Sequence, residues 1–134
     1  MWTCPKCQRT FQKKDQPHSC KTIALADHFK GKEKARVLFD ELVKRINEDI
    51  GNVKIISLPC CIHLFGTYDF AAILPKKDKL ELRFGSHEKL TNPRIANAVP
   101  VSLSSYKIVV YISCSTEIDK ELIDWLRRAY KLND

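Results

Sequence analysis

The fold is decided by residues 53–84, which read VKIISLPCCIHLFGTYDFAAILPKKDKLELRF. β-Branched and aromatic residues fill this stretch in short runs separated by proline, glycine or polar clusters, a pattern typical of consecutive strands. Residues 80–84 alternate strictly, with leucine or phenylalanine at the even positions and Glu81 and Arg83 between them. Strands joined by short turns pair in antiparallel fashion, so this stretch predicts an antiparallel sheet. The predicted strands are residues 53–58, 61–65, 67–74, 80–84 and 107–112.

Two amphipathic helices flank these strands. Apolar residues recur at three- and four-residue spacing over residues 33–50, and a second such pattern begins between Thr116 and Lys120, with Thr116 and Asp119 as rival N-caps. Residues 85–103 lack a clear pattern and are expected to be mostly loop, with a short helix opening at Asn92-Pro93. Two helices cover one face of a sheet, so we expect an α+β fold with about five strands and one partly open face. That face is a candidate binding surface.

The composition fits one globular domain with a small appendage. The chain has 134 residues, of which 44% are hydrophobic and 29% charged. We expect a zinc-finger-like segment over residues 1–22 and an α+β domain over residues 23–134. The chain contains no apolar run of the roughly 18 residues that a membrane span requires, and its first residues do not read as a signal peptide. We therefore expect a soluble cytoplasmic protein that does not contact membranes.

The first twenty residues carry a metal-ligand pattern. Cys4 and Cys7 form a C-x2-C turn, and His18 and Cys20 follow after ten and twelve intervening residues. Two thiolates three positions apart reach one tetrahedral ion, and two further ligands close the site, as in structural zinc centres. Because so short a segment cannot fold on hydrophobic burial alone, the metal must supply the missing stability. The sequence predicts one structural Zn²⁺ on these four side chains.

The same segment is basic. The formal net charge is +7, and residues 1–34 contribute eight Lys or Arg against three Asp or Glu. Such asymmetry suggests nucleic acid as a partner, while a solvated surface explains it equally well. Pro17 stands before His18, and the last two ligands are two residues apart, so this finger lacks the recognition helix that reads bases. We expect a hairpin plus a loop, with nonspecific nucleic-acid contact or a protein partner. The candidate contact residues are Lys6, Arg9, Lys13 and Lys14.

The remaining cysteines give a weaker signal for chemistry. Cys60, Cys61 and Cys114 stand among apolar residues, where cysteine usually packs as a small buried side chain. Cys61 and His63 share a face of a strand, so a nucleophile–base pair is conceivable there, although no third orienting group is evident. The sequence favours a non-enzymatic zinc-binding module. The alternative is a small enzyme with its site on the open sheet face near Cys61 and His63.

Several motifs together resemble one family. They are Trp2-Thr-Cys-Pro-Lys-Cys7 with Asp15-Gln-Pro-His-Ser-Cys20, Gly31-Lys32, the hairpin from Phe70 through Pro75-Lys-Lys-Asp-Lys79-Leu80, and the ending Leu122-Ile-Asp-Trp-Leu-Arg-Arg-Ala-Tyr130. Over nearly the whole chain the sequence resembles an uncharacterised bacterial family, domain of unknown function 5655. The resemblance implies an α+β fold and a bacterial cytoplasmic location. It implies no activity.

Overall fold

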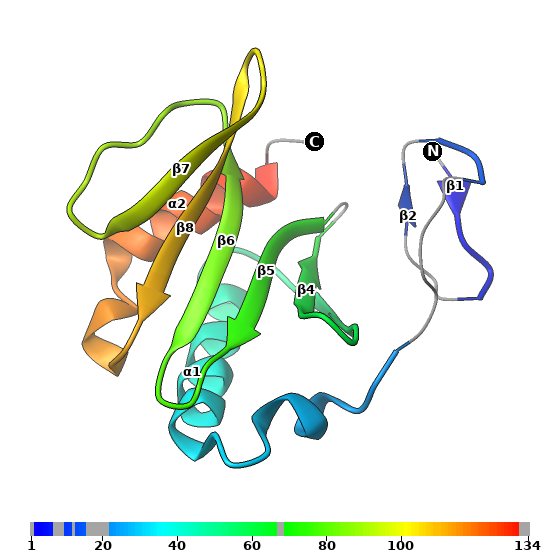
Figure 1. Cartoon of the computed structure of the whole chain (residues 1–134). Helices are drawn as coiled ribbons and strands as arrows, with labels where there is room; N and C mark the ends of the chain where they lie inside the picture. The colour runs from blue at the N-terminus through cyan, green and yellow to red at the C-terminus, as the bar shows by residue number, and fades with distance from the viewer. Residues whose placement is uncertain (1, 7–9, 12, 16–21, 67–68, 132–134) are drawn as a thin grey trace.

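The computed structural model describes residues 2–6, 10–11, 13–15, 22–66 and 69–131 (Figure 1). The described residues form two α-helices, two short 3-10 helices and eight strands, joined by turns and loops. In chain order they are β1 (Trp2–Thr3), β2 (Thr10–Phe11), η1 (Leu25–Phe29), α1 (Glu33–Asp49), β3 (Lys54–Ser57), β4 (Ile62–Phe65), β5 (Asp69–Pro75), β6 (Leu80–Ser86), β7 (Ile95–Ser102), β8 (Ser105–Ile112), η2 (Ser115–Glu117) and α2 (Lys120–Lys131).

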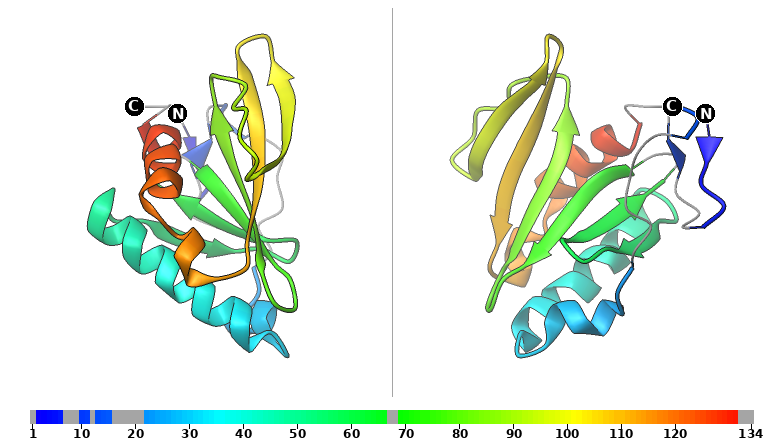
Figure 2. Two further views of the ribbon diagram at one scale, coloured as in Figure 1. Left: turned by 90° about the vertical axis from the view of Figure 1, so that its left-hand side faces the viewer. Right: turned by 45° about the vertical axis from the view of Figure 1, so that its right-hand side comes forward.

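The six strands β3 to β8 form one sheet in the order β3-β4-β5-β6-β8-β7. Every neighbouring pair is antiparallel. Both helices lie against the same face of this sheet, as the side view in Figure 2 shows. The predicted α+β fold is therefore confirmed. We call the sheet face that points away from α1 and α2 the open face.

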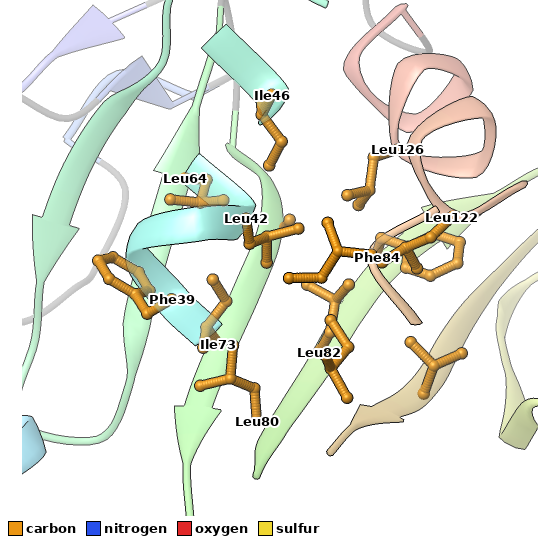
Figure 3. Close-up of a cluster of buried hydrophobic side chains, with 14 of the residues drawn as sticks. Phe39, Leu42, Ile46, Leu64, Ile73, Leu80, Leu82, Phe84, Leu122 and Leu126 are labelled. Atoms are coloured by element: carbon orange, nitrogen blue, oxygen red, sulfur yellow. The ribbon is translucent and has the colours of Figure 1, made fainter. Parts of the chain in front are cut away.

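The core lies between the sheet and the two helices. On β6, the even positions 80–84 are buried as their alternation predicts, with Leu80 and Leu82 fully enclosed. Figure 3 shows how they meet side chains from α1 and α2. The largest fully buried side chains come from all these elements: Phe39, Leu42, Ile46, Ile62, Leu64, Ile73, Leu80, Leu82, Ile108, Ile112, Leu122 and Leu126. None of the described residues of the N-terminal segment belongs to this core.

The sheet has one more strand than predicted, because the expectation of loop over residues 85–103 is wrong for residues 95–102. These residues form β7, an edge strand paired only with β8. Its register shifts between Ile95 and Asn97 and again between Pro100 and Ser102, so its side chains do not alternate cleanly. Asn92 opens a turn rather than a helix, since its backbone oxygen accepts from Ile95 N at 2.9 Å.

The last helix begins at the later of its two predicted caps. Asp119 Oδ1 accepts a hydrogen bond from Leu122 N at 3.0 Å, while Thr116 lies in η2. Arg94 Nη1 donates to the same carboxylate at 2.8 Å and ties the start of β7 to α2. Burial alone would raise the pKa of Asp119, but the hydrogen bonds from Arg94 and Leu122 outweigh it and the pKa is lowered. Asp119 therefore acts as cap and ion-pair partner together.

Among the residues that the structure describes, neither helix combines the length and the apolar surface needed to cross a bilayer.

Candidate metal centre

The N-terminal segment begins as the predicted hairpin. Strands β1 and β2 pair in antiparallel fashion, and the rings of Trp2 and Phe11 lie with centroids 6.1 Å apart. Cys4 follows β1 directly and is buried, with 4% of its surface exposed. The other three predicted ligands, Cys7, His18 and Cys20, lie outside the described residues. The four-ligand zinc site thus stays a prediction.

The predicted nucleic-acid contacts are in part described. Lys6, Lys13 and Lys14 are exposed, and Arg9 lies outside the described residues. The structure therefore leaves this contact surface untested.

A second group of cysteine and histidine lies at the turn between β3 and β4. Leu58 N donates to Cys61 O at 2.9 Å, and this bond closes a turn whose inner residues are Pro59 and Cys60. The turn brings Cys60 Sγ to 3.0 Å from Cys61 Sγ. Cys61 Sγ in turn lies 3.1 Å from Nε2 of His63, which confirms that these two side chains share a face.

A third partner for this pair comes from β5. His63 Nδ1 lies 2.5 Å from Asp69 Oδ2. Simple alternation would not place Asp69 on the open face, because His63 pairs with Ala72, three positions away. The register shifts between Leu64 and Phe65, so β5 gains one residue there and Asp69 moves to the face of His63. Alternation likewise fails for Phe70, which turns toward the core and packs edge-on against Tyr130.

The hydrogen bond from His63 to Asp69 decides the state of the imidazole. A carboxylate accepts, so Nδ1 carries the hydrogen and Nε2 presents its lone pair to the sulfur atoms. A lone pair in that place can take the proton of a thiol or bind a metal ion. No orienting group is evident in the sequence, and the structure supplies one in Asp69.

The three cysteines outside the N-terminal segment differ in their exposure to solvent. Cys61 is buried at 8% exposure, but Cys60 and Cys114 are exposed, so only one of the three packs as a small core residue. Burial, followed by the neighbouring Cys60 thiol, raises the pKa of Cys61 to about 12. The raised pKa keeps Cys61 in the thiol form at neutral pH, which makes it a poor free nucleophile.

The donor atoms fit a metal ion better than an unassisted nucleophile. The Cys60 and Cys61 sulfurs and one His63 ring nitrogen all lie within 4.8 Å of one another. A tetrahedral zinc ion with bonds of about 2.3 Å to sulfur and about 2.0 Å to nitrogen holds its ligand atoms about 3.5 to 3.8 Å apart. The S···S separation of 3.0 Å and the S···N separation of 3.1 Å are shorter than this, so metal binding would require side-chain rotations that lengthen both. Asp69 then takes the place of the carboxylate that commonly supports a metal-bound histidine.

The cluster opens onto a groove of about 360 Å³ on the open face. Cys61, His63 and Asp69 line one end, and Arg83 and Lys107 line it farther along the sheet. Arg83 Nε donates to Glu81 Oε2 at 2.7 Å, and Tyr111 donates to the other carboxylate oxygen at 3.2 Å. Burial alone would raise the pKa of Glu81, but these partners outweigh it and the pKa is lowered. Glu81 is therefore a charged, fully engaged group that holds Arg83 in place.

The sequence contained part of this site. Cys61 and His63 were found by their spacing on a strand, and Cys60 stands beside them in the same motif. Asp69 was missed because its position depends on the bulge, and nothing in residues 65–70 signals a bulge to an alternation analysis. A count of metal-binding side chains over residues 60–69, without regard to face, would have found all four.

Comparison with known proteins gives a family and no closer relative. The family described as Domain of unknown function (DUF5655) matches residues 25–133. No curated protein and no solved structure matches the chain. The match spans both α-helices and the complete six-stranded sheet, including the Cys60–Asp69 region. The chain therefore belongs to this family of uncharacterised domains.

Proposed function

We propose that this protein is a zinc-binding module with a metal centre on Cys60, Cys61 and His63 at the β3–β4 corner. The observation that carries this proposal is the convergence of two sulfur atoms and one imidazole nitrogen within 4.8 Å. Thiolate and imidazole are ligands that zinc prefers, and the two negative charges of the thiolates balance the charge of the ion. Asp69 supports the site from behind, through Nδ1 of His63.

The same contacts would also suit a thiol enzyme with Cys61 as nucleophile, His63 as base and Asp69 as orienting residue. Two features disfavour it. Cys60 Sγ occupies a place 3.0 Å from the would-be nucleophile, and Cys61 is itself buried. A metal ion uses the second sulfur, whereas a nucleophile–base pair has no use for it. The metal centre thus explains more of the observed arrangement.

Under this proposal the chain binds a second zinc ion at Cys4, Cys7, His18 and Cys20. That ion has a structural role, because four protein ligands leave no position for another molecule. The hairpin of β1 and β2 and the burial of Cys4 support this assignment.

The test uses Co²⁺ as a spectroscopic substitute for zinc. In the variant Cys4→Ser/Cys7→Ser, which lacks two N-terminal ligands, we expect one equivalent of Co²⁺ with sulfur-to-metal charge-transfer absorption. Adding Cys61→Ala should abolish that absorption, while adding Cys114→Ala should leave it, because Cys114 is exposed and far from the cluster in sequence. Absence of the band before Cys61 is changed, or its survival afterwards, would show that this site holds no metal.

A second candidate function is nonspecific nucleic-acid binding by the N-terminal segment. It is favoured by the exposure of Lys6, Lys13 and Lys14 next to the β1–β2 hairpin. Exposed lysines neutralise phosphates without reading bases, so binding should be of the order of micromolar or weaker and should fall steeply with salt.

Fluorescence anisotropy with random duplex and single strands tests this candidate. The variant Lys13→Glu/Lys14→Glu should lose binding at low salt. The matched control is Lys77→Glu/Lys89→Glu, which makes the same charge change at two exposed positions of the α+β domain and should retain it. Equal losses in both variants would mean that only the net charge matters.

A further inference from the structure

We propose that the metal ion at Cys60, Cys61 and His63 binds a phosphate group, either inorganic phosphate or a small phosphate monoester, in the groove on the open face. This inference rests on the proposed metal centre and names its ligand. It is carried by the number of protein ligands, by the small side chains on the groove floor, and by the cations at its far end.

The metal centre has three protein ligands rather than four. Among the described residues, the group that could hold the ion contains Cys60, Cys61 and His63 alone. Asp69 is engaged on the opposite nitrogen of His63. A zinc ion with three protein ligands keeps a fourth position for water or another molecule. Because Cys61 and His63 both line the groove, that position faces the groove.

The part of the sheet beside the metal centre carries small side chains. His63 pairs with Ala72, and Ala72 pairs with Arg83, so these three residues form one row across β4, β5 and β6. Neighbouring strands lie about 4.8 Å apart, so His63 and Arg83 are separated by about 10 Å along the sheet. In this row the residue between His63 and Arg83 is Ala72, whose side chain is a single methyl group. In the next row of β6 and β8, Gly85 pairs with Lys107 and adds no side chain.

Two basic side chains, Arg83 and Lys107, lie at the far end of this gap, and Arg83 is paired with Glu81. Arg83 lines the groove and keeps part of its guanidinium accessible, with 37% of the side chain exposed. Lys107 is half-buried, and its ammonium has no ion-pair partner among the described residues. A partly buried lysine whose ammonium has no counterion favours the approach of an anion.

These features together select phosphate over a carboxylate. A phosphate has three or four oxygens arranged around one centre, so one can bind the metal while the others face Arg83 and Lys107. A carboxylate has two oxygens in one plane and carries a single charge. The open position of the metal ion, the part of the Arg83 guanidinium that Glu81 leaves free and the Lys107 ammonium can each take a separate oxygen, which suits phosphate.

The experiment titrates phosphate and phenyl phosphate into the full chain loaded with Co²⁺, at constant ionic strength set with chloride. We expect a saturable change in the cobalt ligand-field bands with either compound. Lys107→Gln should weaken this binding by roughly tenfold or more, the usual scale for the loss of one charge-assisted hydrogen bond. The matched control Lys77→Gln removes the same charge at an exposed turn and should leave the affinity unchanged.

The outcomes separate the two proposals. Without any thiolate-to-cobalt band attributable to Cys61, the metal centre itself fails. If that band is present but phosphate does not change the ligand-field spectrum, the centre stands and the phosphate inference is overturned. It is likewise overturned if acetate produces the same change at the same concentration, or if Lys107→Gln and Lys77→Gln behave alike. A response to phenyl phosphate but not to inorganic phosphate would support the inference and identify monoesters as the ligand.

Discussion

The N-terminal segment and the β3–β4 corner both gather cysteine and histidine, yet they are built in opposite ways. In the segment, the predicted ligands Cys4, Cys7, His18 and Cys20 are spread over seventeen positions, and the described part of the β1–β2 hairpin has two residues in each strand. At the corner, Cys60, Cys61 and His63 stand on a turn and a strand within a six-stranded sheet. We expect the first group to need a metal to form a structure, whereas the second is positioned by the sheet itself.

The comparison implies that the stability of the α+β domain comes from its core and not from metal. Leu82→Ala removes a fully buried side chain facing both helices and should lower the free energy of unfolding by about 2 to 5 kcal/mol. Val37→Ala, on the exposed face of α1, should change it by less than about 0.5 kcal/mol. Urea unfolding followed by far-UV circular dichroism measures both. If a chelator lowered the free energy of unfolding as much as Leu82→Ala does, the α+β domain would depend on metal for its stability, contrary to this expectation.

Support for the corner site should come through Asp69. Removing it by Asp69→Ala leaves the imidazole of His63 without the partner at 2.5 Å and should weaken metal binding at the corner about 10- to 100-fold. Asp78→Ala removes an equal charge from the exposed β5–β6 turn and serves as the control. Competition with a chelating dye, in the Cys4→Ser/Cys7→Ser background, measures the affinity. Equal metal affinities in the two variants would show that Asp69 does not support the metal site.

Acid should affect the α+β domain through an ion pair that is independent of metal. The pKa of Asp119 is lowered in the folded state, so its contribution is present above the unfolded value of about 3.9 and is lost as the pH falls below it. We expect the wild type to exceed Asp119→Asn by about 0.5 kcal/mol at pH 7, as for partly exposed ion pairs. Urea unfolding between pH 3 and pH 7 should show this difference shrink as the pH falls below about 3.9. A difference that stayed constant over this range would contradict a role for the Asp119 charge.

The smallest effect on the α+β domain should come from the N-terminal site. Cys7→Ser should make residues 1–22 sensitive to protease while changing the free energy of unfolding of the domain by less than about 0.5 kcal/mol. Limited proteolysis with mass analysis of the fragments, together with urea unfolding, measures both. Cooperative loss of the whole domain in Cys7→Ser would show that the segment is part of the core.

The two regions also show what sequence patterns can and cannot establish. The periodicity of residues 33–50 and the alternation of residues 80–84 predicted α1 and β6, because each face of these elements meets a single environment. β7 was missed since an edge strand with two register shifts meets no such uniform environment. The pairing of Cys61 with His63 follows from strand geometry, but Asp69 reaches His63 only because β5 has a bulge. The charge pattern of the first 34 residues suggested a partner, and the described structure does not test it.

The zinc content of the protein tests the central claim most directly. Native mass spectrometry of protein purified without added metal should find two zinc ions in the wild type, one in Cys7→Ser and one in Cys61→Ala. The ion that remains in Cys7→Ser is the one assigned to Cys60, Cys61 and His63. A wild type with a single zinc ion that is lost in Cys7→Ser and kept in Cys61→Ala would contradict the account.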